Sequence, residues 1–316
     1  MIDPLIHALK GNYSSILMLH RISSIKPDAL PANQNMNVSP DELADFITNV
    51  KRRGWVFLSL DEMYERLVNK KKLSKTLVLT ADDGYRDNLT EGLEVISAYK
   101  VPLCVYVTTS FPDKTAKLWW YALEDAVCYD AKKNDKDYDI GLMNERFIKL
   151  RSKYLESYTN PEKYFSDYFP TFEPDWNSYC EKYCLKWDEI VFLSKNPQIT
   201  IGAHTVNHAC LQALTYHDAW KEIENSKTKI QDKISLRVEH FCYPFGGSDE
   251  ASSREYNMAT EMGFKTATTT VGGNVFPEHK DRLTSLPRYI YKQSYKIGYL
   301  SGLKQNAKYV LKSLYV

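Results

Sequence analysis

Apolar residues in this chain form short runs that alternate with longer stretches of helical periodicity. Residues 76–81 and 102–108 are almost continuously apolar, which is typical of strands buried on both faces. The segment 14–19 is a third strand of similar length. A stretch with apolar residues at helical spacing lies at 88–99, between two of these strands. Strand–helix–strand alternation of this kind favours parallel pairing and an α/β fold.

Two helices are predicted between the first and second strands. Ser39 is a suitable N-cap, Pro40 fits the first helical position, and this helix ends near Gly54. A second helix begins at Ser59 and ends in the lysines at 70–72, where positive charge suits the carboxyl end of the helix dipole.

From about residue 111 to residue 197 the strand pattern disappears. Helical stretches at 117–130, 141–158 and 174–195 are separated by prolines, so this region is predicted to be a helical insertion. Since it leaves one strand end and returns just before another, we expect it to cover one side of the active-site mouth and help to choose the substrate. The alternative is that it only packs on the barrel or forms a dimer contact.

The strand pattern resumes after the insertion. Strands are predicted at 198–203, 238–243, 264–270 and near 287–291, with helices at 215–234, 251–262 and 294–314. About seven strands, mostly followed by helices, predict a single domain over residues 1–316 with the architecture of a distorted (β/α) barrel. An open doubly wound sheet is the alternative.

Charge and composition exclude several classes of protein. Lys and Arg number 41 against 40 Asp and Glu, so there is no basic excess of the kind that nucleic-acid binders have. No apolar run is long enough to span a membrane, and the first residues lack a secretory pattern, so a cytoplasmic location is expected. The 23 tyrosines suit either a core or a surface that stacks on sugars. Cys180 and Cys184 are spaced four apart, which favours a helical face over a metal pair.

Polar residues follow the predicted strands at their carboxyl ends, where functional residues of parallel α/β folds lie. Asp82 and Asp83 are adjacent after one strand. If both are buried, two like charges require a cation, and Gly84 permits a turn that would aim them into a cleft. A plain surface turn is the alternative.

His204 and His208 follow a later strand with a spacing that places both imidazoles on one face of a helical turn. With Asp83 they form a three-ligand set with open positions, which is typical of a catalytic metal site. They could instead be hydrogen-bonded core histidines. Further along, the Phe245 N–H in a Pro-Phe-Gly-Gly turn is a candidate oxyanion donor.

Three segments in order, Thr80–Gly84, His204–His208 and Tyr243–Gly246, resemble the successive motifs of the polysaccharide deacetylase family, the NodB-homology carbohydrate esterases. The elements Leu17–Arg21 and Leu286–Arg288 are similar to those of its bacterial envelope-polysaccharide branch. The resemblance implies a deformed β/α barrel and metal-dependent removal of an N-acetyl group from an amino sugar or oligosaccharide. Such a substrate could be lipid-linked, with peripheral membrane contact.

The resemblance also implies residue roles. Asp82 would be the general base, and the Phe245 N–H would hold the oxyanion. The metal ligands would be Asp83, His204 and His208, and the metal is usually Zn²⁺.

The sequence departs from the family pattern at three places. Ala81 stands where Phe is usual, and Cys242 stands where many members carry an Arg that orients the base, a role that Arg288 or Arg86 could take. The usual C-terminal general-acid histidine is missing, because no histidine follows His279. His20 is the predicted replacement.

Several other functions are left open by the sequence. The chain could be a non-catalytic carbohydrate-binding module, a deformylase acting on a lipid- or nucleotide-linked sugar, or a two-His-one-carboxylate iron oxygenase. Release of acetate or formate would identify a hydrolase, whereas consumption of oxygen would identify an oxygenase.

Overall fold

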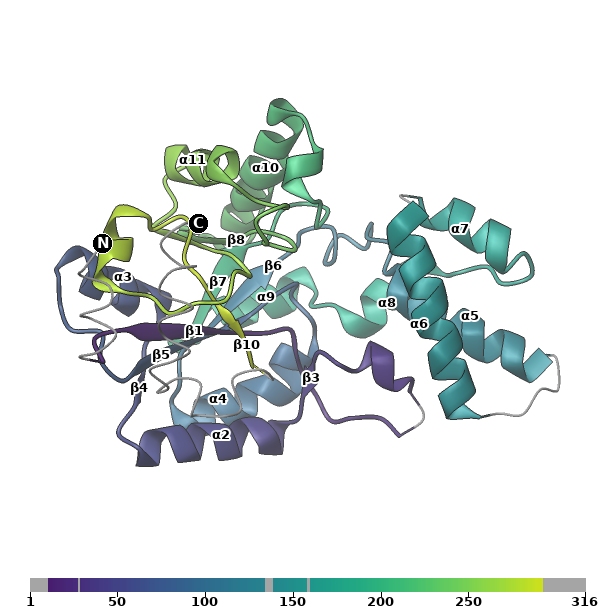
Figure 1. Cartoon of the computed structure of the whole chain (residues 1–316), viewed down its shortest axis with the longest axis horizontal. Coiled ribbons are helices and arrows are strands. Elements are labelled where there is room, and N and C mark those ends of the chain that lie inside the picture. Colours follow the sequence, from purple (N-terminus) through teal and green to yellow (C-terminus); the bar gives the residue numbers. More distant parts are fainter. Residues whose placement is uncertain (1–10, 28, 134–138, 158–159, 292–316) are drawn as a thin grey trace.

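A single parallel sheet forms the centre of the protein (Figure 1). The computed structural model describes residues 11–291 except for 28, 134–138 and 158–159. The strands, in their order across the sheet, are β10 (Tyr289–Ile290), β1 (Ser14–Leu19), β5 (Thr76–Ala81), β6 (Leu103–Val107), β7 (Ile199–Ala203), β8 (His240–Cys242) and β9 (Thr266–Thr268). The short strand β4 (Val56–Phe57) pairs with the start of β5, and β2 (Arg21–Ile22) pairs with β3 (Asn37–Val38).

Helices surround this sheet on both sides (Figure 1). They are α2 (Pro40–Arg52), α3 (Leu60–Val68), a π-turn (Asn88–Gly92) that continues into α4 (Leu93–Tyr99), α10 (Tyr216–Ile234) and α11 (Ser253–Glu261). Short 3₁₀ turns lie at Pro31–Asn33, Leu211–Ala213 and Pro277–Asp281. Ser39 and Ser59 each accept a hydrogen bond from the backbone N–H three residues on, as predicted for N-caps.

The segment 286–290, which contains the last strand β10, joins the two edges of the sheet. The Leu286 N–H donates to the Ala267 carbonyl of β9, while Tyr289 pairs with Leu17 of β1. Residues 286–290 therefore lie between the two ends of the strand order, and the sheet curls into a distorted barrel. The barrel prediction is confirmed, and the open doubly wound alternative is wrong. The predicted helix 294–314 lies outside the described residues.

Most of the insertion forms a lobe of helices beside the barrel (Figure 1). The lobe contains α5 (Trp119–Lys133), α6 (Ile140–Ser157), α7 (Pro161–Tyr168) and α8 (Trp176–Tyr183), and the last helix of the insertion is α9 (Trp187–Ser194). Its aromatic side chains pack on one another in a core of their own that includes Tyr154, Tyr164 and Phe165.

Two details of the insertion differ from the sequence prediction. The predicted helix 174–195 is two helices, and the second, α9, packs Ile190 and Leu193 into the core of the barrel instead. In addition, α7 was not predicted. It begins at Pro161 because proline fits the first position of a helix and Asn160 caps it.

Close packing inside the barrel generates a prediction at Gly202. A Cβ atom there would lie 3.0 Å from the His240 carbonyl oxygen and closer still to the Tyr106 ring. Gly202→Ala should therefore lower the free energy of unfolding by about 1–3 kcal/mol. Gly141→Ala, at the exposed start of α6, should cost less, because a Cβ there would meet only the exposed Asp139 side chain, at 2.9 Å, and that side chain can shift. Urea denaturation measures both, and equal midpoints for the two variants would contradict this packing argument.

Candidate active site

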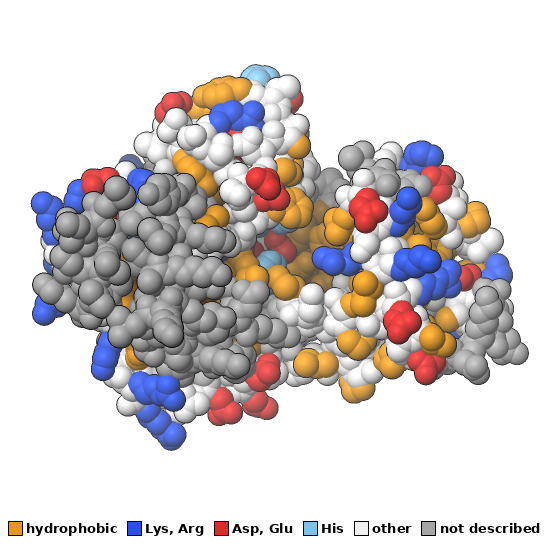
Figure 2. Space-filling view, in the orientation of Figure 1, with side chains coloured by type: hydrophobic (Ala, Val, Ile, Leu, Met, Phe, Trp, Pro, Cys, Tyr) orange, Lys and Arg blue, Asp and Glu red, His pale blue; other side chains and the backbone are white. Residues whose placement is uncertain are grey.

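The predicted site residues converge at the carboxyl ends of the strands. Figure 2 shows a hollow between the barrel and the helical lobe, with acidic and histidine side chains at its floor. Asp82 and Asp83 follow β5, His204 follows β7, and Arg288 precedes β10. All four are at least 94% buried.

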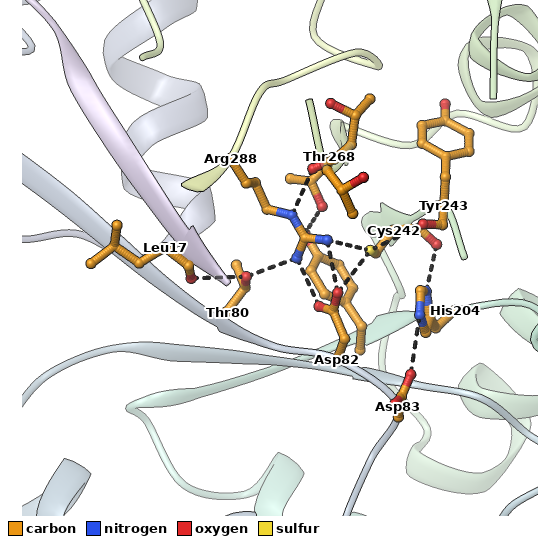
Figure 3. Close-up of polar contacts among 12 residues, drawn as sticks. Leu17, Thr80, Asp82, Asp83, His204, Cys242, Tyr243, Thr268 and Arg288 are labelled. Carbon is orange, nitrogen blue, oxygen red and sulfur yellow. Dashed lines mark hydrogen bonds and ion pairs between the residues drawn. The ribbon is translucent and has the colours of Figure 1, made fainter. Parts of the chain in front are cut away.

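Asp82 and Arg288 form a two-pronged ion pair (Figure 3). Both terminal nitrogens of the guanidinium lie 2.7 Å from separate oxygens of the carboxylate. Arg288 also donates to the Thr269 carbonyl at 2.9 Å and to the Thr80 hydroxyl at 3.0 Å, and its Nη2 lies 2.9 Å from Cys242 Sγ. Such a fork fixes the plane of the carboxylate as well as its charge.

The pair keeps both groups ionised although both are buried. Burial raises the pKa of Asp82, but the charge and hydrogen bonds of Arg288 outweigh it, so the net pKa lies below the usual value. Burial likewise lowers the pKa of Arg288, and the Asp82 charge raises it above its usual value. Cys242 beside them is a neutral thiol, because burial raises its pKa well above the usual range.

Asp83 points away from Asp82 and toward the two histidines. Its Oδ1 lies 3.4 Å from His204 Nε2 and 3.3 Å from His208 Nε2, and Figure 3 shows the first of these contacts. Its backbone has φ +75°, a left-handed conformation that Asp tolerates better than most residues. This turn allows neighbouring carboxylates to face different partners.

These three side chains fit a metal ion. Their ligand atoms all lie within 4.8 Å of one another, and Asp83 Oδ1 is buried among the described residues without a hydrogen-bond donor. His204 Nδ1 lies 2.7 Å from the Cys242 carbonyl. Because a carbonyl can only accept a hydrogen bond, Nδ1 carries the ring proton and donates it to this contact, which leaves the lone pair of Nε2 free to bind a metal.

The predicted reason for this convergence is wrong. Residues 204–208 are not a helical turn but an irregular loop, in which Thr205 and His208 have φ values of +64° and +54°. The loop brings the two imidazoles to a centroid separation of 5.0 Å. Strained backbone of this kind concentrates at functional sites, and the i,i+4 spacing alone could not predict it.

Phe245 lies at the rim of the site. Its ring is 53% exposed and contacts His208 at a centroid distance of 4.9 Å. Its backbone has φ +62°. No acceptor among the described residues takes its N–H, so this donor is available to a ligand.

His20 directly follows β1 and lies near the carboxylates. The Asn88 side-chain amide donates to its carbonyl at 3.1 Å. Burial lowers the pKa of its imidazole, and Asp83 and Asp82 oppose that effect without overcoming it. The pKa of the His20 imidazole therefore lies below its usual value, so the protonated ring, which is the form that could donate a proton, is favoured only at lower pH.

Of the two arginines considered for Asp82, the structure brings only Arg288 to it. Arg86 pairs instead with Glu189 of α9 at 2.7 Å. The supporting contacts of Arg288 with Thr80 and Thr269 were not predicted, and no sequence signal distinguishes these threonines from other strand residues. Cys180 and Cys184 are buried in the core of the insertion.

A second ligand set shares this site. Asp82, His204 and Cys242 also bring three potential ligand atoms within 4.8 Å of one another. Arg288 already occupies both oxygens of Asp82 and contacts the thiol. A divalent cation here would face a buried positive charge, so this second set is the poorer metal site.

The barrel thus carries a candidate metal-binding Asp–His cluster and a paired carboxylate at the carboxyl ends of its strands. The family model for polysaccharide deacetylases matches residues 69–267, more than half of the chain. The protein belongs to the polysaccharide deacetylase family and is an enzyme of the N-deacetylase class. The matched region contains Asp82, Asp83, His204 and His208, whereas Arg288 lies beyond it.

Solved structures share this fold. The Streptococcus pyogenes deacetylase PplD in complex with acetate aligns with a TM-score of 0.61 and 19% identity, covering 94% of this chain and 98% of its own. IcaB from Ammonifex degensii aligns with a TM-score of 0.58 and 14% identity, covering 95% of this chain and 97% of its own. The putative polysaccharide deacetylase BA0330 from Bacillus anthracis aligns with a TM-score of 0.56 and 16% identity, covering 94% of this chain and 69% of its own. No curated protein matches the sequence.

The metal-ligand assignment predicts a specific loss of metal. His204→Ala should abolish binding of one zinc equivalent, because it removes one of three ligands. Asp82→Asn should keep the metal, and His217→Ala, on the exposed face of α10, serves as a control. Elemental analysis after dialysis measures the content. Full zinc occupancy in His204→Ala would refute the assignment.

The Asp82–Arg288 pair predicts strong energetic coupling. Arg288→Met leaves a buried carboxylate unpaired, so the free energy of unfolding should fall by about 3–5 kcal/mol. The double variant Asp82→Asn/Arg288→Met should lose less than the sum of the two single losses. Chemical denaturation of all four proteins measures this coupling. Losses that simply add would show that the two groups do not depend on each other.

Proposed function

We propose that this protein is a metal-dependent hydrolase that removes an N-acetyl group from an amino sugar during surface-polysaccharide or lipopolysaccharide synthesis. One observation carries the proposal. Two adjacent aspartates have different partners, with Asp82 held by Arg288 and Asp83 facing His204 and His208. This arrangement supports one carboxylate as a base and the other as a metal ligand.

Asp83, His204 and His208 would hold the metal, for which Zn²⁺ is the best match to one carboxylate and two imidazoles. When bound, zinc would polarise the acetyl carbonyl and lower the pKa of water. The tautomer of His204 set by the Cys242 carbonyl suits this role. Family membership makes the iron oxygenase alternative unnecessary.

Asp82 would take the proton from the attacking water. The carboxylate is ionised because Arg288 lowers its pKa against the effect of burial. The guanidinium fork also fixes its orientation, and a carboxylate oxygen that accepts one hydrogen bond retains a lone pair for a proton. Arg288 is thus proposed as the residue that positions the base, in place of the family arginine that Cys242 replaces.

The acyl carbon becomes tetrahedral when the water attacks it. The N–H of Phe245 would donate to the oxygen that gains negative charge. The amine of the sugar leaves poorly unless it is protonated, and His20 would donate that proton. Its position at the end of β1, near both aspartates, supports this role.

The insertion is proposed to help choose the substrate, because it forms one wall of the hollow above the site (Figure 2). Trp120 is partly exposed and is a suitable residue for testing this. Tyr164 is not, because it is fully buried and donates to the Leu150 carbonyl, so its removal would damage the lobe itself. If Trp120→Ala has unchanged kinetics on every substrate, the insertion does not choose the substrate and only packs on the barrel or forms a dimer contact.

The proposal also concerns the group to which the sugar is attached and the cellular compartment in which the protein acts. No described helix combines the length and apolar character that crossing a bilayer requires. A lipid-linked substrate would require contact with a membrane surface. The predicted cytoplasmic location stays a prediction, which fractionation of producing cells would test.

Product analysis with zinc-loaded protein tests the function. N-acetylated chitooligosaccharides and N-acetylated nucleotide sugars should release acetate, and Asp82→Asn should release none although it keeps zinc. Formate from N-formylated sugars, without acetate, would favour the deformylase. Binding of these sugars without any release would favour the carbohydrate-binding module.

His20→Ala tests the proposed acid. Turnover should fall by roughly two or more orders of magnitude, the scale of acid catalysis, while fold and zinc content are kept. The basic limb of the pH–rate profile should disappear, because that limb reports loss of the acid's proton. Turnover close to wild type in a folded, zinc-loaded variant would exclude His20 as the acid.

A further inference from the structure

Arg21, next to His20, lies in an unusual set of contacts. Its Nε donates to Asp87 Oδ2 at 2.6 Å, and its Nη1 donates to the Tyr121 hydroxyl at 2.7 Å. The rings of Tyr85, Tyr121 and Tyr183 surround the guanidinium, with centroids 5.1, 5.6 and 5.4 Å from its central carbon. Only 14% of the side chain is exposed. Cation–π contacts of a shielded guanidinium add to its hydrogen bonds.

These contacts come from three different parts of the chain. Tyr121 lies on α5 and Tyr183 on α8, both in the insertion, and their rings stack at 3.9 Å. Tyr85 and Asp87 belong to the loop that carries the two site aspartates. Arg21 itself begins β2, directly after His20. One side chain therefore joins the insertion, the aspartate loop and the His20 segment.

Backbone contacts extend the same connection. The Ile22 N–H donates to Asp87 Oδ1 at 3.2 Å, so one carboxylate holds both the side chain of Arg21 and the backbone after it. Asn88 donates from its amide to the carbonyls of both His20 and Tyr85. The Arg86 N–H donates to the Tyr183 carbonyl of α8 at 2.8 Å. The His20 carbonyl and the two residues that follow it are thus fixed relative to the aspartate loop.

The burial of this ion pair and the shape of the guanidinium indicate that a lysine cannot replace Arg21. Asp87 is 6% exposed, and its salt bridge with Arg21 is shielded from water on the insertion side by the tyrosine rings. A lysine would keep the positive charge, but it lacks the planar fork that reaches a carboxylate and a hydroxyl at once.

We propose that Arg21 is a positioning residue that sets His20 against the two aspartates, and that the insertion contributes to catalysis through Tyr121. This inference rests on the proposed role of His20. It gives the insertion a second task beyond substrate choice, since one of the two hydrogen-bond acceptors of Arg21 comes from α5. Misplacement of a proton donor by about 1 Å is enough to slow turnover strongly.

Kinetics of conservative variants form the first test. Arg21→Lys keeps the positive charge, and its kcat should fall by about 10–100-fold. Tyr121→Phe keeps the ring, and its kcat should fall by about 3–10-fold. In both variants KM should change by less than about threefold. Zinc content should be unchanged. Arg86→Lys is the matched control, because Arg86 also joins the aspartate loop to the insertion, through Glu189. It should retain nearly full kcat.

The second test needs no turnover. In NMR spectra of zinc-loaded protein with labelled histidines, Arg21→Lys should shift the His20 ring resonances while those of His204 and His208 stay in place. Unchanged His20 resonances, or an equal loss of kcat in Arg86→Lys, would overturn the inference. If wild-type protein releases no acetate, the proposed function fails, and the NMR result still decides whether Arg21 positions His20.

Discussion

The ion pair between Asp82 and Arg288 is the interaction on which the rest of the site depends. Two charges are buried together, and each is tolerable only because the other is present. The partners are 206 residues apart in sequence. They meet because the segment before β10 lies between β9 and β1, so closure of the barrel and orientation of the carboxylate are one structural event. A chain whose last strand failed to dock would lose the ion pair as well.

This pairing also gives two adjacent aspartates different partners. Arg288 occupies both oxygens of Asp82 and contacts the thiol of Cys242, which leaves a cation with Asp83 and the two histidines. The small side chain of Cys242 is consistent with this solution, because a second arginine there would bring another buried positive charge. The guanidinium that pairs with Asp82 is therefore supplied by the segment just before β10 and not by the position of Cys242.

Sequence reasoning predicted the barrel, because buried parallel strands appear as apolar runs and their carboxyl ends carry the polar residues. It named Arg288 as one of two candidate partners of Asp82 but could not choose between it and Arg86, since long-range pairing leaves no periodic signal. It attributed the convergence of His204 and His208 to a helical turn, whereas positive φ angles in an irregular loop produce it. The break between α8 and α9 was missed because helical propensity continues across it. The packing of α9 on the barrel decides that boundary.

The central claim is that the ion pair with Arg288 keeps Asp82 from binding the metal, so that Asp82 can act as a base and Asp83 binds the metal. Anomalous diffraction at the zinc absorption edge, from crystals of the zinc-loaded protein, tests it most directly. The account predicts one peak within about 2.0–2.2 Å of Asp83, His204 and His208, with the fork between Arg288 and Asp82 intact. A peak bound by Asp82 and Cys242, with Arg288 displaced, would contradict it.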